Sequence, residues 1–309
     1  MARALRLLIA FVRLGRPHFL IGGFVVYGLG AALAALMGAT IDWRRFLLGQ
    51  VAVTATQLMT HYANDYFDFA ADQANTTATR FSGGSRVLPA GELPIIVALG
   101  AALVLATVAI AAIGLLARLG PVGRLPAGLM AAAFFLAWGY SAPPLQLHSR
   151  GVGEITTAVV VTLLTPLLGF VLQTGHLRLL PFLAVMPLCA MQFAMLLAIE
   201  FKDAAGDEAV GKRTLVVRWG GARAARLYQV AVAVAYLWLP MAVVLGLPVA
   251  IAGGILITAP LALWLISQMS RGIWHQPVRW ETLAFATVAL LVATSMAELA
   301  AVLWLLRGL

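Results

Sequence analysis

The feature that most constrains this chain is a series of apolar windows, each about 20 residues long, that recur from one end to the other. Wound as a helix, such a window is long enough to cross the hydrocarbon core of a bilayer. Short polar segments separate the windows, and together they predict nine transmembrane helices. The windows cover residues 18–39, 45–67, 94–117, 122–141, 152–174, 179–200, 222–245, 247–268 and 282–306.

Charged residues are too scarce for a water-soluble protein of this length. They make up 11% of the 309 residues, and 62% are hydrophobic, whereas soluble domains carry about 25% charged residues. We therefore expect an all-α membrane protein that forms a single domain over residues 1–309. The net charge of +9 does not indicate nucleic-acid binding, because the basic residues are scattered between the apolar windows. The N-terminal stretch 1–16 is expected to lie on the membrane surface rather than to be a cleaved signal peptide.

Lysine and arginine are distributed unevenly between the two ends of the predicted spans. With nine spans, 15 of the 21 basic residues fall on the side that holds the N-terminus, and 6 fall on the other. Basic residues accumulate in cytoplasmic loops. The N-terminus is therefore predicted to be cytoplasmic, in a multi-pass protein of a bacterial-type cell membrane.

The carboxylates gather at the predicted cytoplasmic ends of the second and sixth spans. Two short clusters there hold seven of the twelve acids in the chain: Asp65, Asp68, Asp72, Glu200, Asp203, Asp207 and Glu208. Each residue of a helix advances by about 100°, so the three aspartates of the first cluster would fall within an arc of about 60°. Asp203 and Asp207 would fall within about 40°. Each cluster is thus predicted to present its oxygens on one face.

Like charges on one face repel, so basic residues, water or divalent cations must compensate for them. Four basic residues lie near the acids in the sequence: Arg86, Lys202, Lys212 and Arg213. They are too few to neutralise seven acids. Mg²⁺ commonly takes one or two protein carboxylates together with substrate phosphate oxygens, so the pattern favours Mg²⁺ bridging to a diphosphate. The loop 80–94 adds paired glycines, whose backbone N–H groups can approach phosphate oxygens.

Four motifs in the order expected resemble those of the UbiA superfamily of membrane prenyltransferases. The stretch "NDYFDFAAD" (64–72) fits its NDxxDxxxD motif, and "KDAAGD" with "GKRTL" (202–207, 211–215) looks like its second DxxxD motif. "YSAPPLQLHSRGVGE" (140–154) is similar to the stretch after the fourth span, and "GRPHFL" (15–20) to the start of the first. The resemblance extends over the first seven predicted spans.

The resemblance implies an intramembrane enzyme whose nine helices surround a central cavity, capped on the cytoplasmic side by the aspartate-rich loops. Such an enzyme binds a polyprenyl diphosphate from the bilayer and transfers the prenyl chain to an aromatic or other acceptor, with Mg²⁺ as cofactor. Departure of the diphosphate leaves an allylic cation, which an electron-rich carbon attacks. Fixed cations aimed at the departing charge would lower the barrier.

The same resemblance assigns roles to particular residues. It implies that Mg²⁺ is held, and the diphosphate through it, by Asp65, Asp68, Asp203 and Asp207, with help from Asp72. It implies that Asn64, Arg86, Lys202, Lys212 and Arg213 bind the substrate or stabilise the departing diphosphate. Lys202 is expected to be a catalytic residue, together with the four aspartates Asp65, Asp68, Asp203 and Asp207. Tyr140 would stabilise the cation or contact the acceptor, or else be an interfacial aromatic. Arg16 would reach the acceptor carboxylate or the diphosphate, or else reflect topology alone.

The sequence cues for the acceptor conflict. The "FSGGSRVL" loop resembles that of dihydroxynaphthoate-type members, whereas the Asp68–Asp72 spacing is closer to 4-hydroxybenzoate-type members. Glu200 stands where menaquinone-type members often carry an asparagine. We rank 1,4-dihydroxy-2-naphthoate first and another quinone-precursor aromatic second.

Two other classes of protein compete with the prenyltransferase. One is a cation transporter that uses the acidic stripes for passage, although transporters place such groups near the bilayer midplane. The other is a non-catalytic membrane scaffold, which the intact motif residues argue against. Three residues are left without an assigned role: His61, Glu200 and Glu298.

Overall fold

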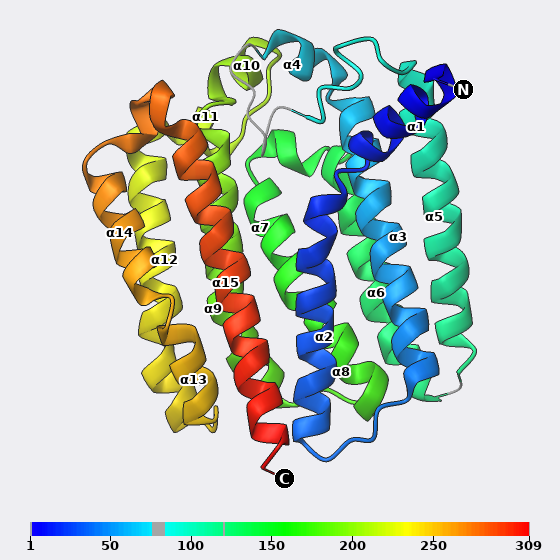
Figure 1. The fold of residues 1–309 in the computed structure, drawn as a ribbon, viewed down its shortest axis with the longest axis vertical. Coiled ribbons are helices and arrows are strands. Elements are labelled where there is room, and N and C mark those ends of the chain that lie inside the picture. Colours follow the sequence, from blue (N-terminus) through cyan, green and yellow to red (C-terminus); the bar gives the residue numbers. More distant parts are fainter. Residues whose placement is uncertain (1, 76–83, 120, 309) are drawn as a thin grey trace.

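The computed structural model describes residues 2–75, 84–119 and 121–308, and in these ranges every regular element is helical. The long helices run side by side in a bundle (Figure 1). In chain order the elements are α1 Ala2–Leu14, η1 Pro17–Phe19, α2 Leu20–Leu36, α3 Trp43–Phe67, α4 Phe69–Ala74, α5 Ile95–Ala117, α6 Pro121–Ser141, η2 Leu147–Arg150, α7 Gly153–Thr157, η3 Ala158–Leu164, α8 Thr165–Thr174, α9 Leu179–Glu200, α10 Ala204–Ala209, α11 Leu215–Trp219, α12 Gly221–Val244, α13 Val249–Leu256, α14 Ala259–Ser270, η4 Ile273–His275, η5 Pro277–Arg279 and α15 Trp280–Leu306.

Six helical segments of the described chain are long and apolar enough to cross a membrane, and the bent pair α13 and α14 would make a seventh. The predicted count of nine is therefore not confirmed. Two long helices fall outside this set, α3 and α6, which nevertheless pack against each other and against α5 inside the bundle. One reason is that α3 carries polar side chains, among them Gln57, Thr60 and His61, and these lower its hydropathy.

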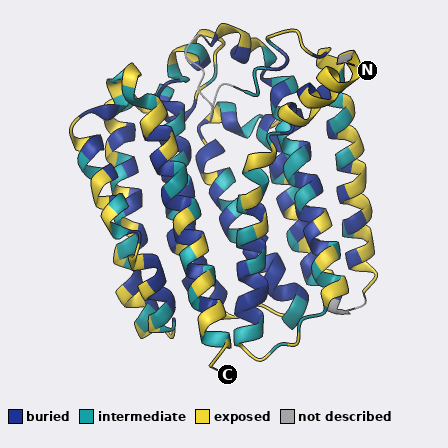
Figure 2. Ribbon diagram, in the orientation of Figure 1, coloured by how far each residue is buried: buried dark blue, intermediate teal, exposed yellow. Residues whose placement is uncertain are grey.

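The outer surface of the bundle is apolar, as lipid contact requires. Figure 2 shows exposed stripes along the outward sides of the long helices. They include large apolar side chains such as Val104 of α5 and Leu237 and Val244 of α12, which are 65%, 75% and 86% exposed. Water would not tolerate so much exposed apolar surface, whereas hydrocarbon does. The pattern confirms an integral, multi-span membrane fold.

Small residues bring helices of the bundle into backbone contact. A Cβ added to Gly30 of α2 would overlap the Pro166 carbonyl of α8, and one added to Gly169 of α8 would overlap the Tyr27 carbonyl of α2. Without a hydrophobic force between helices in lipid, such close approach supplies much of the packing energy.

The helix α1 is separate from α2 and lies at an angle to the bundle (Figure 1). The chain turns between them at Arg16, whose φ of 48° is left-handed. The outward side chains of α1, such as Leu5 and Leu8, are apolar and exposed, which is typical of a segment at a membrane surface.

Both acidic clusters lie at the same end of the bundle, where α4 packs against α10 (Figure 1). The sequence predicts that each cluster lies on one continuous helix, but in the structure each cluster spans a break between two helices. The α3 helix ends at Phe67, and Asp68 separates it from α4 with φ −93° and ψ 4°. The one-turn spacing survives, because the Asp72 N–H donates to the Asp68 carbonyl at 2.8 Å and the Asp207 N–H donates to the Asp203 carbonyl at 2.8 Å.

Candidate functional site

An acidic pocket of about 150 Å³ lies between the two clusters. We call residues 65–72 the first acidic segment and residues 203–207 the second. Four aspartates line the pocket, two from each segment: Asp68, Asp72, Asp203 and Asp207. The other polar residues that line it are Arg16, Asn64, Asn75, Tyr140, His148, Glu200, Lys212 and Thr214. The pocket thus brings together most of the residues that the sequence motifs single out.

Lys212 links the two acidic segments. Its Nζ lies 2.9 Å from Asp68 Oδ2 and 3.6 Å from Asp207 Oδ1. Lys212 is placed there by a turn in which its own N–H donates to the Asp207 carbonyl at 2.8 Å. Burial opposes the charged form of Lys212, but Asp68 and Asp207 outweigh it and raise its pKa. A fixed positive charge therefore stands where the acids of the two segments meet.

Asp68 has the largest set of partners in the pocket. In addition to Lys212, the Asn64 Nδ2 donates to its Oδ2 at 2.7 Å, and His148 Nε2 lies 2.7 Å from its Oδ1. Burial alone would raise the pKa of Asp68, but Lys212 and His148 hold it well below its usual range. Asp68 is therefore a carboxylate throughout the physiological pH range.

The pKa values of Asp72 and Asp207 shift the other way. Burial, with the neighbouring Asp68 charge, raises the pKa of Asp72 to about 7. Burial also raises the pKa of Asp207 to about 6, although Lys212 opposes the shift. Acids crowded in a small pocket hold protons that a bound cation would displace.

Asp65 stands beside the pocket rather than in its lining. It is 1% exposed and forms an ion pair with Arg16. It also accepts hydrogen bonds from the hydroxyl of Ser85 and from the Ser85 N–H, the latter at 3.2 Å. Asp65 thus fixes the Arg16 guanidinium and the part of the loop around Ser85.

Steric constraints explain why the loop has a glycine at position 84. Gly84 has φ +73°, and a Cβ there would overlap the Asp72 carboxylate. Only glycine combines this backbone conformation with so close an approach. The predicted loop 80–94 is otherwise only partly visible, because residues 80–83 lie outside the described residues.

Three predicted basic residues lie outside the lining of the pocket. Lys202 is 2% exposed, and its Nζ lies 3.7 Å from Asp203 Oδ1. Arg86 donates to the main-chain carbonyls of Asp72 and Asn75, so it holds the backbone at the end of the first acidic segment. Arg213 is exposed, and its N–H donates to the Ser149 carbonyl at 2.9 Å. Their assignment to the diphosphate stays a prediction.

His148 is a pocket residue that the sequence reasoning missed. Its Nδ1 lies 2.6 Å from the Tyr140 carbonyl, while its Nε2 faces Asp68. Both nitrogens face acceptor oxygens, and a charged imidazolium can donate to both. Its partner Asp68 is 80 residues away in the chain, so local spacing gives no sign of the contact. Its place within the "YSAPPLQLHSRGVGE" motif was the available signal.

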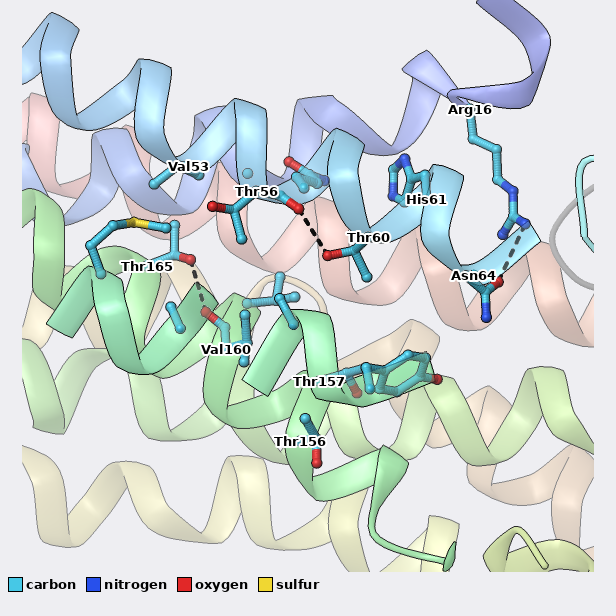
Figure 3. A pocket seen from close by; sticks show the side chains of 17 residues that line it. Arg16, Val53, Thr56, Thr60, His61, Asn64, Thr156, Thr157, Val160 and Thr165 are labelled. Carbon is cyan, nitrogen blue, oxygen red and sulfur yellow. Dashed lines mark hydrogen bonds between the residues drawn. The ribbon is translucent and has the colours of Figure 1, made fainter. Parts of the chain in front are cut away.

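A second cavity, of about 230 Å³, adjoins the acidic pocket and shares three of its lining residues: Arg16, Asn64 and Tyr140. Figure 3 shows it between α3 on one side and α7, η3 and α8 on the other. It extends along α3 from Asn64 to Val53, a distance of about 16 Å at 1.5 Å per residue. His61 also lines it, with its Nδ1 2.7 Å from the Gly15 carbonyl, so the side chain has a cavity position.

The wall of this cavity is more apolar than its residue types suggest. Four of its five threonines donate their hydroxyls to a main-chain carbonyl three to five residues earlier, within 2.7–3.0 Å: Thr60, Thr156, Thr157 and Thr165. Their hydroxyls are therefore already satisfied. The Gln57 amide likewise donates to the Phe19 carbonyl at 2.8 Å. We call this second space the apolar cavity.

The donor set of the acidic pocket fits a hard divalent cation that also binds phosphate. Its four aspartates provide oxygen ligands, the type that Mg²⁺ prefers. Among the described residues, no three acidic, histidine or cysteine side chains converge to hold an ion by themselves.

Comparison with known proteins gives three relevant results. A model of the UbiA prenyltransferase family matches residues 24–291. The chain is 27% identical over 241 residues to the 1,4-dihydroxy-2-naphthoate octaprenyltransferase of Bacillus subtilis (strain 168), which covers 76% of this chain and 73% of that protein. The fold of the present chain is similar to those of two solved structures. The sequence identities are so low that these matches support only the fold.

The first is the apo structure of a UbiA homologue from Aeropyrum pernix K1, with a TM-score of 0.68 and 16% identity over 90% of this chain and 97% of that one. The second is a UbiA homologue from Archaeoglobus fulgidus bound to DMAPP and Mg²⁺, with a TM-score of 0.61 and 15% identity over 94% and 99%.

Proposed function

The chain belongs to the UbiA prenyltransferase family, and on that premise we propose that it transfers a polyprenyl group from an isoprenyl diphosphate to an aromatic quinone precursor, with Mg²⁺ as cofactor. We propose 1,4-dihydroxy-2-naphthoate as the acceptor, because the Bacillus relative is named for it. The alternative acceptor is 4-hydroxybenzoate. The Archaeoglobus homologue bound to DMAPP and Mg²⁺, and to GPP and Mg²⁺, supports the donor class and the cofactor.

One observation carries the proposal. Aspartates from two segments more than 130 residues apart line one pocket, and Lys212 joins them. A diphosphate carries several negative charges, so it binds such a pocket only together with cations. Bound Mg²⁺ would supply that charge and stabilise the leaving group. Asp68, Asp72, Asp203 and Asp207 would hold the ions, and Lys212 would donate to a phosphate oxygen.

The proposed reaction breaks the C–O bond between the prenyl chain and the diphosphate, and the bonding electrons leave with the diphosphate. A ring carbon of the acceptor then forms a C–C bond to the allylic cation. The ring regains its aromaticity by losing carbon dioxide from dihydroxynaphthoate, or a proton from 4-hydroxybenzoate. The cation must be kept from water. Tyr140 lines both the pocket and the cavity, which supports a role for it beside the cation.

The prenyl tail would occupy the apolar cavity. The cavity opens from the pocket at Arg16, Asn64 and Tyr140, so a tail could continue directly from a bound diphosphate. Its 16 Å along α3 would hold about three to four isoprene units. The satisfied threonine hydroxyls leave few polar groups that would penalise an aliphatic chain.

We also propose that α3 and α6 cross the membrane with the other helices, which gives nine spans and a cytoplasmic N-terminus. The support is the distribution of 15 basic residues against 6, which follows the positive-inside rule. The acidic pocket would then open toward the cytoplasm.

The test uses the purified protein with geranylgeranyl diphosphate and a panel of aromatic acceptors, read by mass spectrometry. We expect a prenylated product only when Mg²⁺ is present, and loss of transfer in Asp65→Asn and in Asp203→Asn. A product that retained the acceptor carboxylate would contradict dihydroxynaphthoate as the acceptor.

The matched control is Asp42→Asn, which changes a partly exposed aspartate that caps α3 at the opposite end of the bundle. Diphosphate release without any need for Mg²⁺ would contradict the mechanism. Cation flux in liposomes without turnover would favour the transporter instead.

A further inference from the structure

Two buried glutamates lie close together at the acidic pocket, and neither forms an ion pair with a described basic residue. Glu154 of α7 is fully buried, and Glu200 at the end of α9 is 8% exposed. The two helices pack against each other, and the carboxyl group of Glu154 is a close neighbour of that of Glu200. Acids this deeply buried are rarely without a function.

One oxygen of the pair has a structural task. Glu154 Oε1 accepts the Leu215 N–H at 2.8 Å, which fixes the start of α11. The other buried oxygens, Glu154 Oε2 and Glu200 Oε2, have no donor among the described groups. Because the two carboxyl groups are close neighbours, the position of Glu154 constrains that of Glu200.

The remaining oxygen of the pair is available to a ligand. Glu200 lines the acidic pocket near Tyr140, whereas Glu154 stands behind it. Glu200 Oε1 accepts no hydrogen bond from any group in the described ranges, while Asp68, Asp203 and Asp207 all have basic or amide partners. A carboxyl oxygen repels phosphate, so its natural ligand is an O–H or N–H donor.

We propose that Glu200, held in place by Glu154, anchors the aromatic acceptor by accepting a hydrogen bond from one of its hydroxyl groups. This inference rests on the proposed function, because it needs a hydroxylated aromatic acceptor. The contact holds the ring beside Tyr140, where the pocket meets the apolar cavity and the prenyl carbon would lie. It also draws the hydroxyl proton toward the carboxyl, so the ring becomes richer in electrons and attacks the cation more readily.

Selectivity for the hydroxyl follows from the same contact. A buried acceptor that loses its donor pays the full cost of desolvation, so an acceptor whose hydroxyl is methylated should bind poorly. Glu200 is thus a substrate-contacting residue, and Glu154 is a positioning residue.

The experiment compares 1,4-dihydroxy-2-naphthoate with its 1-O-methyl and 4-O-methyl ethers as acceptors, in wild type and in four variants. In wild type, we expect kcat/KM for at least one ether to be lower by about 10- to 100-fold. Glu200→Leu should raise the KM of the parent acceptor by a similar factor and remove most of the gap between parent and ether. Glu200→Gln keeps an acceptor oxygen and should retain part of the gap.

Glu154→Gln still accepts the Leu215 N–H, so we expect the fold to persist while the acceptor KM rises and the donor KM does not. The matched control is Glu298→Gln, because Glu298 is equally buried but lines neither cavity. Its acceptor and donor KM should stay at wild-type values.

Two results would overturn the inference alone. One is a wild-type enzyme that uses both ethers as well as the parent, which needs no variant to be folded. The other is a Glu200→Gln or Glu200→Leu protein that keeps the full gap or loses Mg²⁺-dependent donor binding instead. If wild type releases no diphosphate with any hydroxylated acceptor, the proposed function fails as well, and that measurement identifies the case.

Discussion

The two acidic segments reach the same pocket, but the protein holds them differently. In the first, Asp65 is held by Arg16 and Ser85, and Asp68 is held by Asn64, His148 and Lys212. In the second, Asp203 accepts from Asn75 at 2.6 Å and lies near Lys202, and Asp207 has Lys212. The first segment is thus fixed before a ligand arrives, whereas the second is linked to it by few contacts.

This difference separates two tasks within one site. A preorganised group loses little free energy when it meets a developing charge, so the first segment suits the chemical step. A segment with few contacts can adjust to donors and close over them. We therefore expect changes in the first segment and its partners to lower kcat, and changes in the links between the segments to act mainly on binding.

The largest effect should come from Lys212, whose ammonium group contacts an aspartate of each segment. Lys212→Met removes the one ammonium that lies between Asp68 and Asp207, together with a donor to the leaving group. We expect kcat to fall by about 10²–10³-fold, as for loss of one electrostatic stabiliser. Single-turnover assays of diphosphate release would measure it. Arg226→Met, on the exposed side of α12, is the control, and equal activity of the two variants would contradict the role of Lys212.

His148 tests whether the fixed state of the first segment matters. In His148→Phe, Asp68 loses a partner that holds its carboxylate in place. Loss of such an orienting contact typically weakens metal binding by about 10- to 100-fold, so we expect a higher Mg²⁺ requirement and a smaller change in kcat at saturating Mg²⁺. Titration of activity with Mg²⁺ would show the shift. His176→Phe changes an exposed histidine at the other end and should leave the titration unchanged.

The sequence identifies the helices better than the contacts between them. Apolar windows locate every long helix within a few residues, because burial in lipid imposes a length that can be counted. Motif spacing also identifies both acidic segments, because residues one helical turn apart in the sequence stay one turn apart even at the break between α3 and α4. The count of spans is less secure, since α3 carries the polar residues that line the cavity and so resembles a soluble helix in composition.

Partners that are distant in sequence could not be predicted. Nothing local to His148 indicates that its ring meets Asp68, or that Glu154 meets Glu200 across 46 positions. The first contact joins η2 to the end of α3, and the second joins α7 to the end of α9, so both depend on how the whole bundle packs. Proximity in the sequence can also mislead. Arg86 and Arg213 lie near the acids in the chain, yet neither lines the pocket.

A pH titration compares the acids within the pocket. The pKa of Asp72 is about 7 and that of Asp207 about 6, both above the ordinary value, whereas that of Asp68 is held low. The raised groups are protonated below these values, and a cation must displace the protons. We therefore expect the apparent Kd for Mg²⁺ to rise by about tenfold between pH 7 and pH 6. A Kd that is constant from pH 8 to pH 6 would contradict the raised values.

The smallest effect should come from Asn75, which follows α4 and donates to Asp203 Oδ1 at 2.6 Å. Asn75 lies three residues after the first segment, so this bond ties the end of α4 to the second segment, but it carries no charge. Loss of one such hydrogen bond amounts to about 1 kcal/mol, so Asn75→Ala should raise the KM of the prenyl diphosphate by about fivefold and leave kcat nearly unchanged. If kcat fell instead, the second segment would be as much a part of the chemical step as the first, and the division of tasks between them would not hold.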